Sequence, residues 1–136
     1  MIKKISFLPE FIPLIKEGKK TVTRRVKKKN TGVYYFTGGR TGKKEGYIRI
    51  VEARELGLFE GFFKTPKTQK AMIDEIRAEG CLDLWEFIEI WNKLAPRRYR
   101  WPNPPMDNPI EPKIWRIKFK YIGEDYEQDT MARLLV

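Results

Sequence analysis

Hydrophobic positions along the chain change their spacing several times, and each spacing predicts a different element. Strict alternation of apolar and polar residues, typical of a half-buried strand, is clearest over Lys113–Tyr121. Three more strands are expected over residues 4–8, Gly32–Phe36 and Tyr47–Ala53. A turn rich in glycine and lysine separates the last two, so they are predicted to form a hairpin.

Helical spacing of apolar residues predicts three helices. The first begins at Pro9 and ends before Gly18, because proline suits the first turn of a helix and glycine its end. The second covers Thr68–Ala78. The third begins at Asp83, with Glu86 in the capping-box position three residues later. The resulting order predicts one α+β domain over residues 1–136, in which a small barrel would pair its first and last strands beneath flanking helices.

Composition agrees with a folded domain and gives no sign of a membrane protein. The chain has 136 residues, of which 41% are hydrophobic and 13% aromatic, enough to form a core. No apolar run approaches the length that spans a bilayer. The first ten residues carry charges and a proline and lack the apolar stretch of a signal peptide, so a cytoplasmic location is expected.

The chain contains no histidine and one cysteine, Cys81. This excludes zinc sites built on His and Cys, an internal disulfide, and catalytic triads that need histidine. The acidic residues show no ligand-like spacing, so no metal and no cofactor are expected. Any chemistry would have to use Lys, carboxylates, Thr, Tyr or Arg.

Positive charge is concentrated near the start of the chain. The net charge is +10, and residues 1–60 alone hold 15 Lys and Arg against 6 Asp and Glu. Such a concentration attracts polyanions, of which RNA and DNA are the commonest in cells. The candidate nucleic-acid-binding residues are Lys19, Lys20, Arg24, Arg25, Lys27, Arg40, Arg98, Arg100 and Trp101.

Two of these assignments have structural alternatives. Trp101 lies among arginines in the proline-rich segment Ala95–Pro112, where it could stack on an unpaired base or instead fix the loop to the barrel. The basic segment after Gly18 could bind a polyanion or simply be a solvated strand edge.

Three segments together resemble the ASCH family. Gly18-Lys19-Lys20-Thr21-Val22-Thr23-Arg24-Arg25 is similar to the family's G-x-K-T-x-T-x-R form. Glu79–Trp91 resembles its Glu-Gly turn followed by a helix that ends near a tryptophan, and Pro112–Phe119 resembles its closing strand. The resemblance covers roughly residues 3–121 in the family's order and implies a PUA-like mixed β-barrel with flanking helices.

The resemblance also implies a site. Some ASCH members hydrolyse an acyl amide on a modified cytidine, and others are known or suspected RNA binders or nucleases. By position in the motifs, Lys20 would be the base, Thr23 the nucleophile and Glu79 the proton donor. The extra basic segments of this chain favour a larger ligand than a free nucleoside.

Two geometric conditions follow for this site. In an extended segment Lys20 and Thr23 would face opposite sides, so a bend must bring them together. In addition, Lys20 and Glu79 must converge on one cleft.

Three functions remain open from the sequence. The first is a module that holds single-stranded RNA, or a nucleoside, in the basic cleft. The second is an amidohydrolase acting on N4-acetylcytidine or a related acylated nucleoside, and the third is a ribonuclease. The sequence does not predict the RNA target or the oligomeric state.

Overall fold

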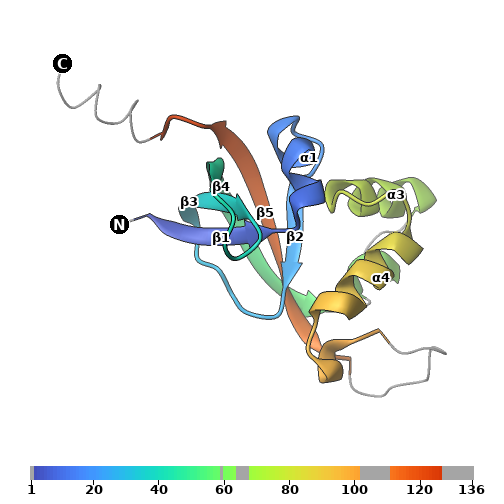
Figure 1. The fold of residues 1–136 in the computed structure, drawn as a ribbon. Coiled ribbons are helices and arrows are strands. Elements are labelled where there is room, and N and C mark those ends of the chain that lie inside the picture. The colour runs from blue at the N-terminus through green and yellow to red at the C-terminus, as the bar shows by residue number, and fades with distance from the viewer. Residues whose placement is uncertain (1, 59, 64–67, 102–110, 127–136) are drawn as a thin grey trace.

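The computed structural model describes residues 2–58, 60–63, 68–101 and 111–126. Strands and helices follow each other along the chain as shown in Figure 1: β1 (Lys3–Phe7), a 3-10 turn (Pro9–Phe11), α1 (Ile12–Lys16), β2 (Val22–Arg25), β3 (Gly32–Gly38), β4 (Lys44–Gly57), α2 (Glu60–Phe63), α3 (Gln69–Ala78), α4 (Leu84–Leu94), a second 3-10 turn (Arg97–Tyr99) and β5 (Lys113–Gly123).

All the described strands belong to one mixed sheet with the order β1-β3-β4-β5-β2. Strands β1 and β3 are parallel, whereas the β3–β4, β4–β5 and β5–β2 pairs are antiparallel. The predicted pairing of the first and last strands is wrong. The final strand β5 instead pairs with β4 and with the short basic strand β2, which takes the place beside β5 that the prediction gave to the first strand.

The sheet curls into a half-barrel, which brings its two edge strands towards each other. The Arg25 guanidinium, on β2, donates a hydrogen bond of 2.7 Å to the Ser6 carbonyl, on β1. The sheet edges are thus linked here by a side chain. The predicted mixed α+β fold with barrel-like curvature is confirmed at this level.

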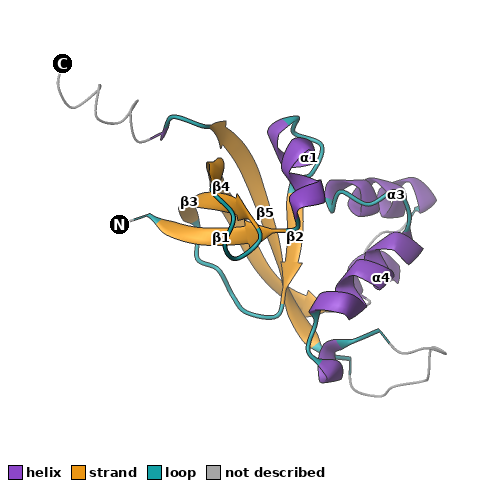
Figure 2. Ribbon diagram, in the orientation of Figure 1, coloured by secondary structure: helices purple, strands orange, loops and turns teal. Residues whose placement is uncertain are grey.

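The core fills the inside of the curled sheet and continues under the helices. Phe36, Ile48 and Phe119 are buried where β3, β4 and β5 meet. Phe87 and Trp91 carry this core onto α4, with their rings stacked at a centroid distance of 6.0 Å. Figure 2 shows the strands on one side of the molecule and α3 and α4 on the other, next to β2.

Side-chain caps are present at the starts of both long helices, the predicted one at Asp83 and another at Thr68. The Thr68 hydroxyl accepts a hydrogen bond from the Ala71 N–H at 3.1 Å, and the Asp83 carboxylate accepts one from the Glu86 N–H at 2.8 Å. These caps fix where α3 and α4 begin, and therefore how the turn between them is presented. Helix α2 was not predicted. Among the described helices, none has the length and apolar character needed to cross a bilayer.

Candidate functional site

The segment before β2 is fixed by hydrogen bonds to two helices. The N–H groups of Lys19 and Lys20 both donate to the Leu14 carbonyl at the end of α1, at 2.9 and 3.0 Å. The Thr21 N–H donates to the Ala78 carbonyl at the end of α3, at 2.8 Å. Lys20 therefore lies before the extended strand, where the alternation of sides does not apply, and it lines the same cleft as Thr23.

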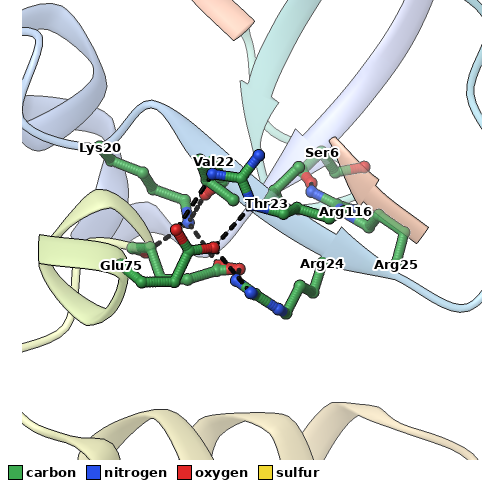
Figure 3. Close-up of polar contacts among 9 residues, drawn as sticks. Ser6, Lys20, Val22, Thr23, Arg24, Arg25, Glu75 and Arg116 are labelled. Atoms are coloured by element: carbon green, nitrogen blue, oxygen red, sulfur yellow. Dashed lines mark hydrogen bonds and ion pairs between the residues drawn. The ribbon is translucent and has the colours of Figure 1, made fainter. Parts of the chain in front are cut away.

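Lys20 is buried, with only 3% of its surface exposed. Its ammonium donates to the Val22 carbonyl at 2.8 Å and to the Glu79 carbonyl, and lies 3.9 Å from Glu79 Oε2 (Figure 3). It also lies 4.4 Å from the centre of the Phe11 ring. Burial lowers the pKa of Lys20 to about 8. The charges of Arg25 and Arg24 also lower this pKa, whereas the charge of Glu79 raises it. The neutral amine is therefore accessible near neutral pH.

Gly80 allows the α3–α4 turn to approach Lys20. Its φ of +88° lies in the left-handed region, which glycine adopts without strain. A Cβ at this position would come within 3.1 Å of the Phe11 ring and 3.2 Å of the Lys20 Cδ. The glycine after Glu79 thus permits both the turn and the close packing of the lysine against it.

Arg24 lies beside Lys20 and is also buried. Its Nη1 is 3.2 Å from Glu79 Oε1, and its Nη2 donates to Glu75 Oε1 at 2.7 Å. The guanidinium stacks over the Phe62 ring, 4.3 Å from its centre. Arg24 Nε, Arg24 Nη1 and Glu79 Oε1 make no hydrogen bond to any described residue, so this buried pair retains bonding capacity.

Two further residues of the site, Glu75 and Arg116, were missed by sequence reasoning. Arg116, on β5, holds the Glu75 carboxylate with two hydrogen bonds of 2.6 and 3.0 Å (Figure 3). Burial opposes ionisation of Glu75, but the bonds from Arg116 and Arg24 outweigh it and hold the pKa of Glu75 below its usual value. A signal existed: Glu75 is four residues before Glu79, on the same face of α3.

Thr23 and Arg25 lie two residues apart on β2 and share a side of the strand, as predicted. The Arg25 Nε donates to Thr23 Oγ1 at 3.1 Å. Because the hydroxyl accepts this bond, its own proton remains available to another acceptor.

Five of these residues form the inner part of a cleft of about 580 Å³. Lys20, Thr23, Arg24, Arg25 and Glu79 all line it. The predicted convergence of Lys20 and Glu79 is confirmed, whereas their chemical roles remain predictions. Aromatic side chains complete the walls of the cleft, namely Phe7, Phe11, Phe87 and Trp91.

Cys81 also lines the cleft, as a buried free thiol. Burial raises its pKa to about 12, so it is protonated and unreactive as a nucleophile near neutral pH.

The other predicted binding residues fall into two groups. Lys27 and Arg40 are exposed and line the cleft. Lys19, Arg98 and Arg100 are exposed and do not line it. Lys19 instead pairs with Glu17 at 3.0 Å, and Arg100 donates to the Ala95 carbonyl at 3.2 Å. The predicted binding residues are thus divided between the cleft and other parts of the surface.

The assignment of Trp101 as an exposed stacking platform is wrong. Trp101 is only 9% exposed, and its ring lies 6.4 Å from that of Phe62. Its N–H donates to the Asn92 amide oxygen at 2.6 Å, while the Asn92 amide donates back to the Trp101 carbonyl at 3.1 Å. Trp101 therefore fixes the segment after α4 to the core, the alternative that the sequence had left open. Residues 102–110 of the same predicted loop lie outside the described residues.

The site can donate many hydrogen bonds and offers both a potential base and a carboxylate. The described residues contain no cluster of His, Cys, Asp or Glu that could hold a metal ion. The polar groups that the cleft lining presents include ammonium, guanidinium, hydroxyl and carboxylate groups.

Comparison with known proteins supports the fold. The chain matches no protein-family model and no curated protein sequence. It is similar to the crystal structure of hypothetical protein PH0355, with a TM-score of 0.55 and 18% sequence identity over 90% of this chain and 100% of that one. This likeness concerns the fold alone.

Proposed function

We propose that the cleft binds a nucleoside unit, either within single-stranded RNA or free, and that the domain is a PUA-like member of the ASCH family. The observation that carries this proposal is the joining of buried cations, a buried carboxylate and aromatic walls in one cleft of about 580 Å³. That volume is within the range of roughly 300–1,000 Å³ typical of small-ligand pockets.

The groups in the cleft suit a nucleobase. Phe11 and Phe87 make parts of the cleft lining aromatic, and Arg24 and Glu79 have polar atoms that make no hydrogen bond to any described residue. A base carries donors and acceptors in its plane, so it could satisfy these groups while its faces contact the aromatic walls. Two of the three segments that resemble the ASCH family supply the cleft with Lys20, Thr23 and Glu79.

The adjacent lysines Lys19 and Lys20 provide the test. We expect Lys20→Met to weaken binding of N4-acetylcytidine, and of labelled single-stranded RNA, by about ten-fold or more, because a buried charged partner is lost. Lys19→Met removes the same charge from an exposed position outside the cleft and should change affinity less than about two-fold. Titration calorimetry would measure both, and equal effects of the two changes would contradict the proposal.

Amide hydrolysis is a second candidate, favoured by the lowered pKa of Lys20 and the free proton of the Thr23 hydroxyl. In this reaction neutral Lys20 takes the hydroxyl proton, and Thr23 Oγ1 bonds to the acyl carbon of the amide. The C–N bond then breaks as the amine leaves with a proton from Glu79 or Lys20, and water releases the acid from the threonine ester. No observation among the described residues favours ribonuclease activity, which stays a prediction.

Release of acetate from N4-acetylcytidine would test the hydrolase. Thr23→Ala should abolish release while preserving nucleoside binding, because only the nucleophile is removed. Thr21→Ala changes the same residue type in the same segment but outside the cleft lining, so it should retain activity. Acetate release by Thr23→Ala at the wild-type rate would exclude this mechanism.

A further inference from the structure

Charge in the cleft is strongly one-sided. Among the described residues that line it, the cations are Lys20, Arg24, Arg25, Lys27, Lys29 and Arg40, and the only acidic residue is Glu79. The inner cations have partners: Lys20 and Arg24 share Glu79, and Arg25 bonds to Ser6 and Thr23. The excess positive charge of the cleft therefore comes from the outer cations Lys27, Lys29 and Arg40.

Lys27, Lys29 and Arg40, here called the basic mouth, form no ion pair with any described carboxylate. Partial burial lowers the pKa of Lys29, and the neighbouring charges of Arg25, Lys3 and Lys27 lower it further. Like charges gathered without a counter-charge repel one another, and a bound anion would relieve that repulsion.

The backbone holds the basic mouth next to the cleft. Lys27 and Lys29 follow directly after β2, whose Arg25 is tied to β1. Arg40 lies in the turn after β3, where the neighbouring Gly39 N–H donates to the Phe7 carbonyl at 2.7 Å and the Lys4 ammonium donates to the Arg40 carbonyl at 2.9 Å. The loops before and after β3 thus present cations to the same opening.

Helix α4 contributes the opposite chemistry to the cleft. Ile90 and Leu94 on α4, and Pro96 just after it, line the cleft without charge. Leu94 is 63% exposed, so an apolar surface reaches the solvent there. A ligand that fits this lining would carry an anionic group on one side and an apolar face on the other, as a nucleotide does.

We propose that the basic mouth is a phosphate subsite, and that the cleft takes a phosphorylated nucleoside in preference to an unphosphorylated one. This inference rests on the proposed function, because the base must occupy the inner cleft for its phosphate to reach Lys27, Lys29 and Arg40. The phosphate could be that of a free nucleotide or one of an RNA strand.

The test compares cytidine, its 5′- and 3′-monophosphates, and a four-nucleotide single-stranded RNA by titration calorimetry. The wild-type protein should bind at least one phosphorylated ligand about ten-fold more tightly than cytidine. Lys27→Gln/Lys29→Gln should remove this preference while leaving cytidine affinity within about two-fold. Preference for the RNA over both monophosphates would identify a strand as the source of the phosphate, and the reverse order a free nucleotide.

A matched control removes two exposed lysines of β5. Lys118→Gln/Lys120→Gln loses the same charge from positions that do not line the cleft. This control should retain the preference for phosphorylated ligands. The salt dependence of binding should fall more in Lys27→Gln/Lys29→Gln than in this control. Equal loss of preference in the two variants would mean a general charge effect and would overturn the subsite.

The remaining outcomes separate the two proposals. Equal affinity of the wild-type protein for cytidine and all phosphorylated ligands would overturn the subsite and leave the proposed function standing. In another outcome the monophosphates bind and cytidine does not, and their binding depends on Lys27 and Lys29 but not on Lys20. That outcome would support the phosphate subsite and contradict the proposal that the inner cleft binds the nucleoside. Absence of binding by all four ligands would overturn both.

Discussion

The inner cleft and the segment Arg97–Trp101 both combine arginine with aromatic side chains, yet the structure uses them in opposite ways. In the inner cleft, buried cations face a buried carboxylate, and the aromatic rings of Phe11 and Phe62 lie beside them. In the Arg97–Trp101 segment the arginines are exposed, and the tryptophan is packed into the core.

This difference teaches that a basic-aromatic cluster in sequence does not identify a site by itself. What distinguishes the inner cleft is the contribution of a third element, the α3–α4 turn, which brings Glu79 to the cations of β2. A buried cation is costly unless it is paired, so the placement of Lys20 and Arg24 is informative in a way that exposed arginines are not.

Removal of the Glu79 carboxylate should produce the largest effect. Glu79→Ala leaves Lys20 and Arg24 buried without their shared counter-charge, so we expect the free energy of unfolding to fall by about 3–5 kcal/mol. Urea denaturation followed by circular dichroism would measure the loss.

The matched control is Glu17→Ala, which breaks the exposed pair between Glu17 and Lys19. Exposed pairs contribute little, so the free energy of unfolding should change by less than about 1 kcal/mol. A similar cost for both variants would show that the inner cleft is not the distinct electrostatic environment described above.

Much of the fold followed from local patterns. The cap at Asp83 and the alternation along β5 depend on neighbouring residues, so they could be predicted. The pairing of the strands could not, because alternation reports which face is buried and not which strand lies alongside. The short β2 carries little hydrophobic signal, yet it occupies the sheet edge beside β5.

The site was predictable where a motif marked it and unpredictable where partners come from distant elements. Lys20, Thr23 and Glu79 were found through the segments that resemble the ASCH family. Arg116 belongs to a strand whose polar positions were assigned to solvent, and only the register of β5 against β2 brings it to Glu75. Pairing over such sequence distances is decided by the fold.

The substitution Trp101→Ala tests the Arg97–Trp101 segment, the other region of the comparison with the inner cleft. The side chain is buried against Phe62 and its backbone is bound to Asn92, so the substitution should lower the free energy of unfolding by about 3 kcal/mol. RNA affinity measured under folding conditions should stay within about two-fold of wild type. Loss of RNA binding without loss of stability would instead restore the role of a stacking platform.

The smallest expected effect is the pH dependence contributed by Lys20. Its pKa is about 8 in the folded protein, against an ordinary value of 10.5, so between these limits the unfolded chain holds a proton that the folded protein has released. Stability contributed by this group therefore rises with pH above about 8, and by about 1 kcal/mol between pH 8 and 9.

The substitution Lys20→Met removes this contribution to stability, while carboxylates and other lysines affect the wild-type and variant proteins alike. The difference in unfolding free energy between wild type and Lys20→Met, measured by urea denaturation at intervals from pH 7 to 9, should be flat at first and then grow in favour of wild type. If the difference in unfolding free energy did not change with pH across this range, Lys20 would stay charged in the cleft. The inner cleft would then have the same protonation as the exposed basic segments, and only burial would distinguish the two.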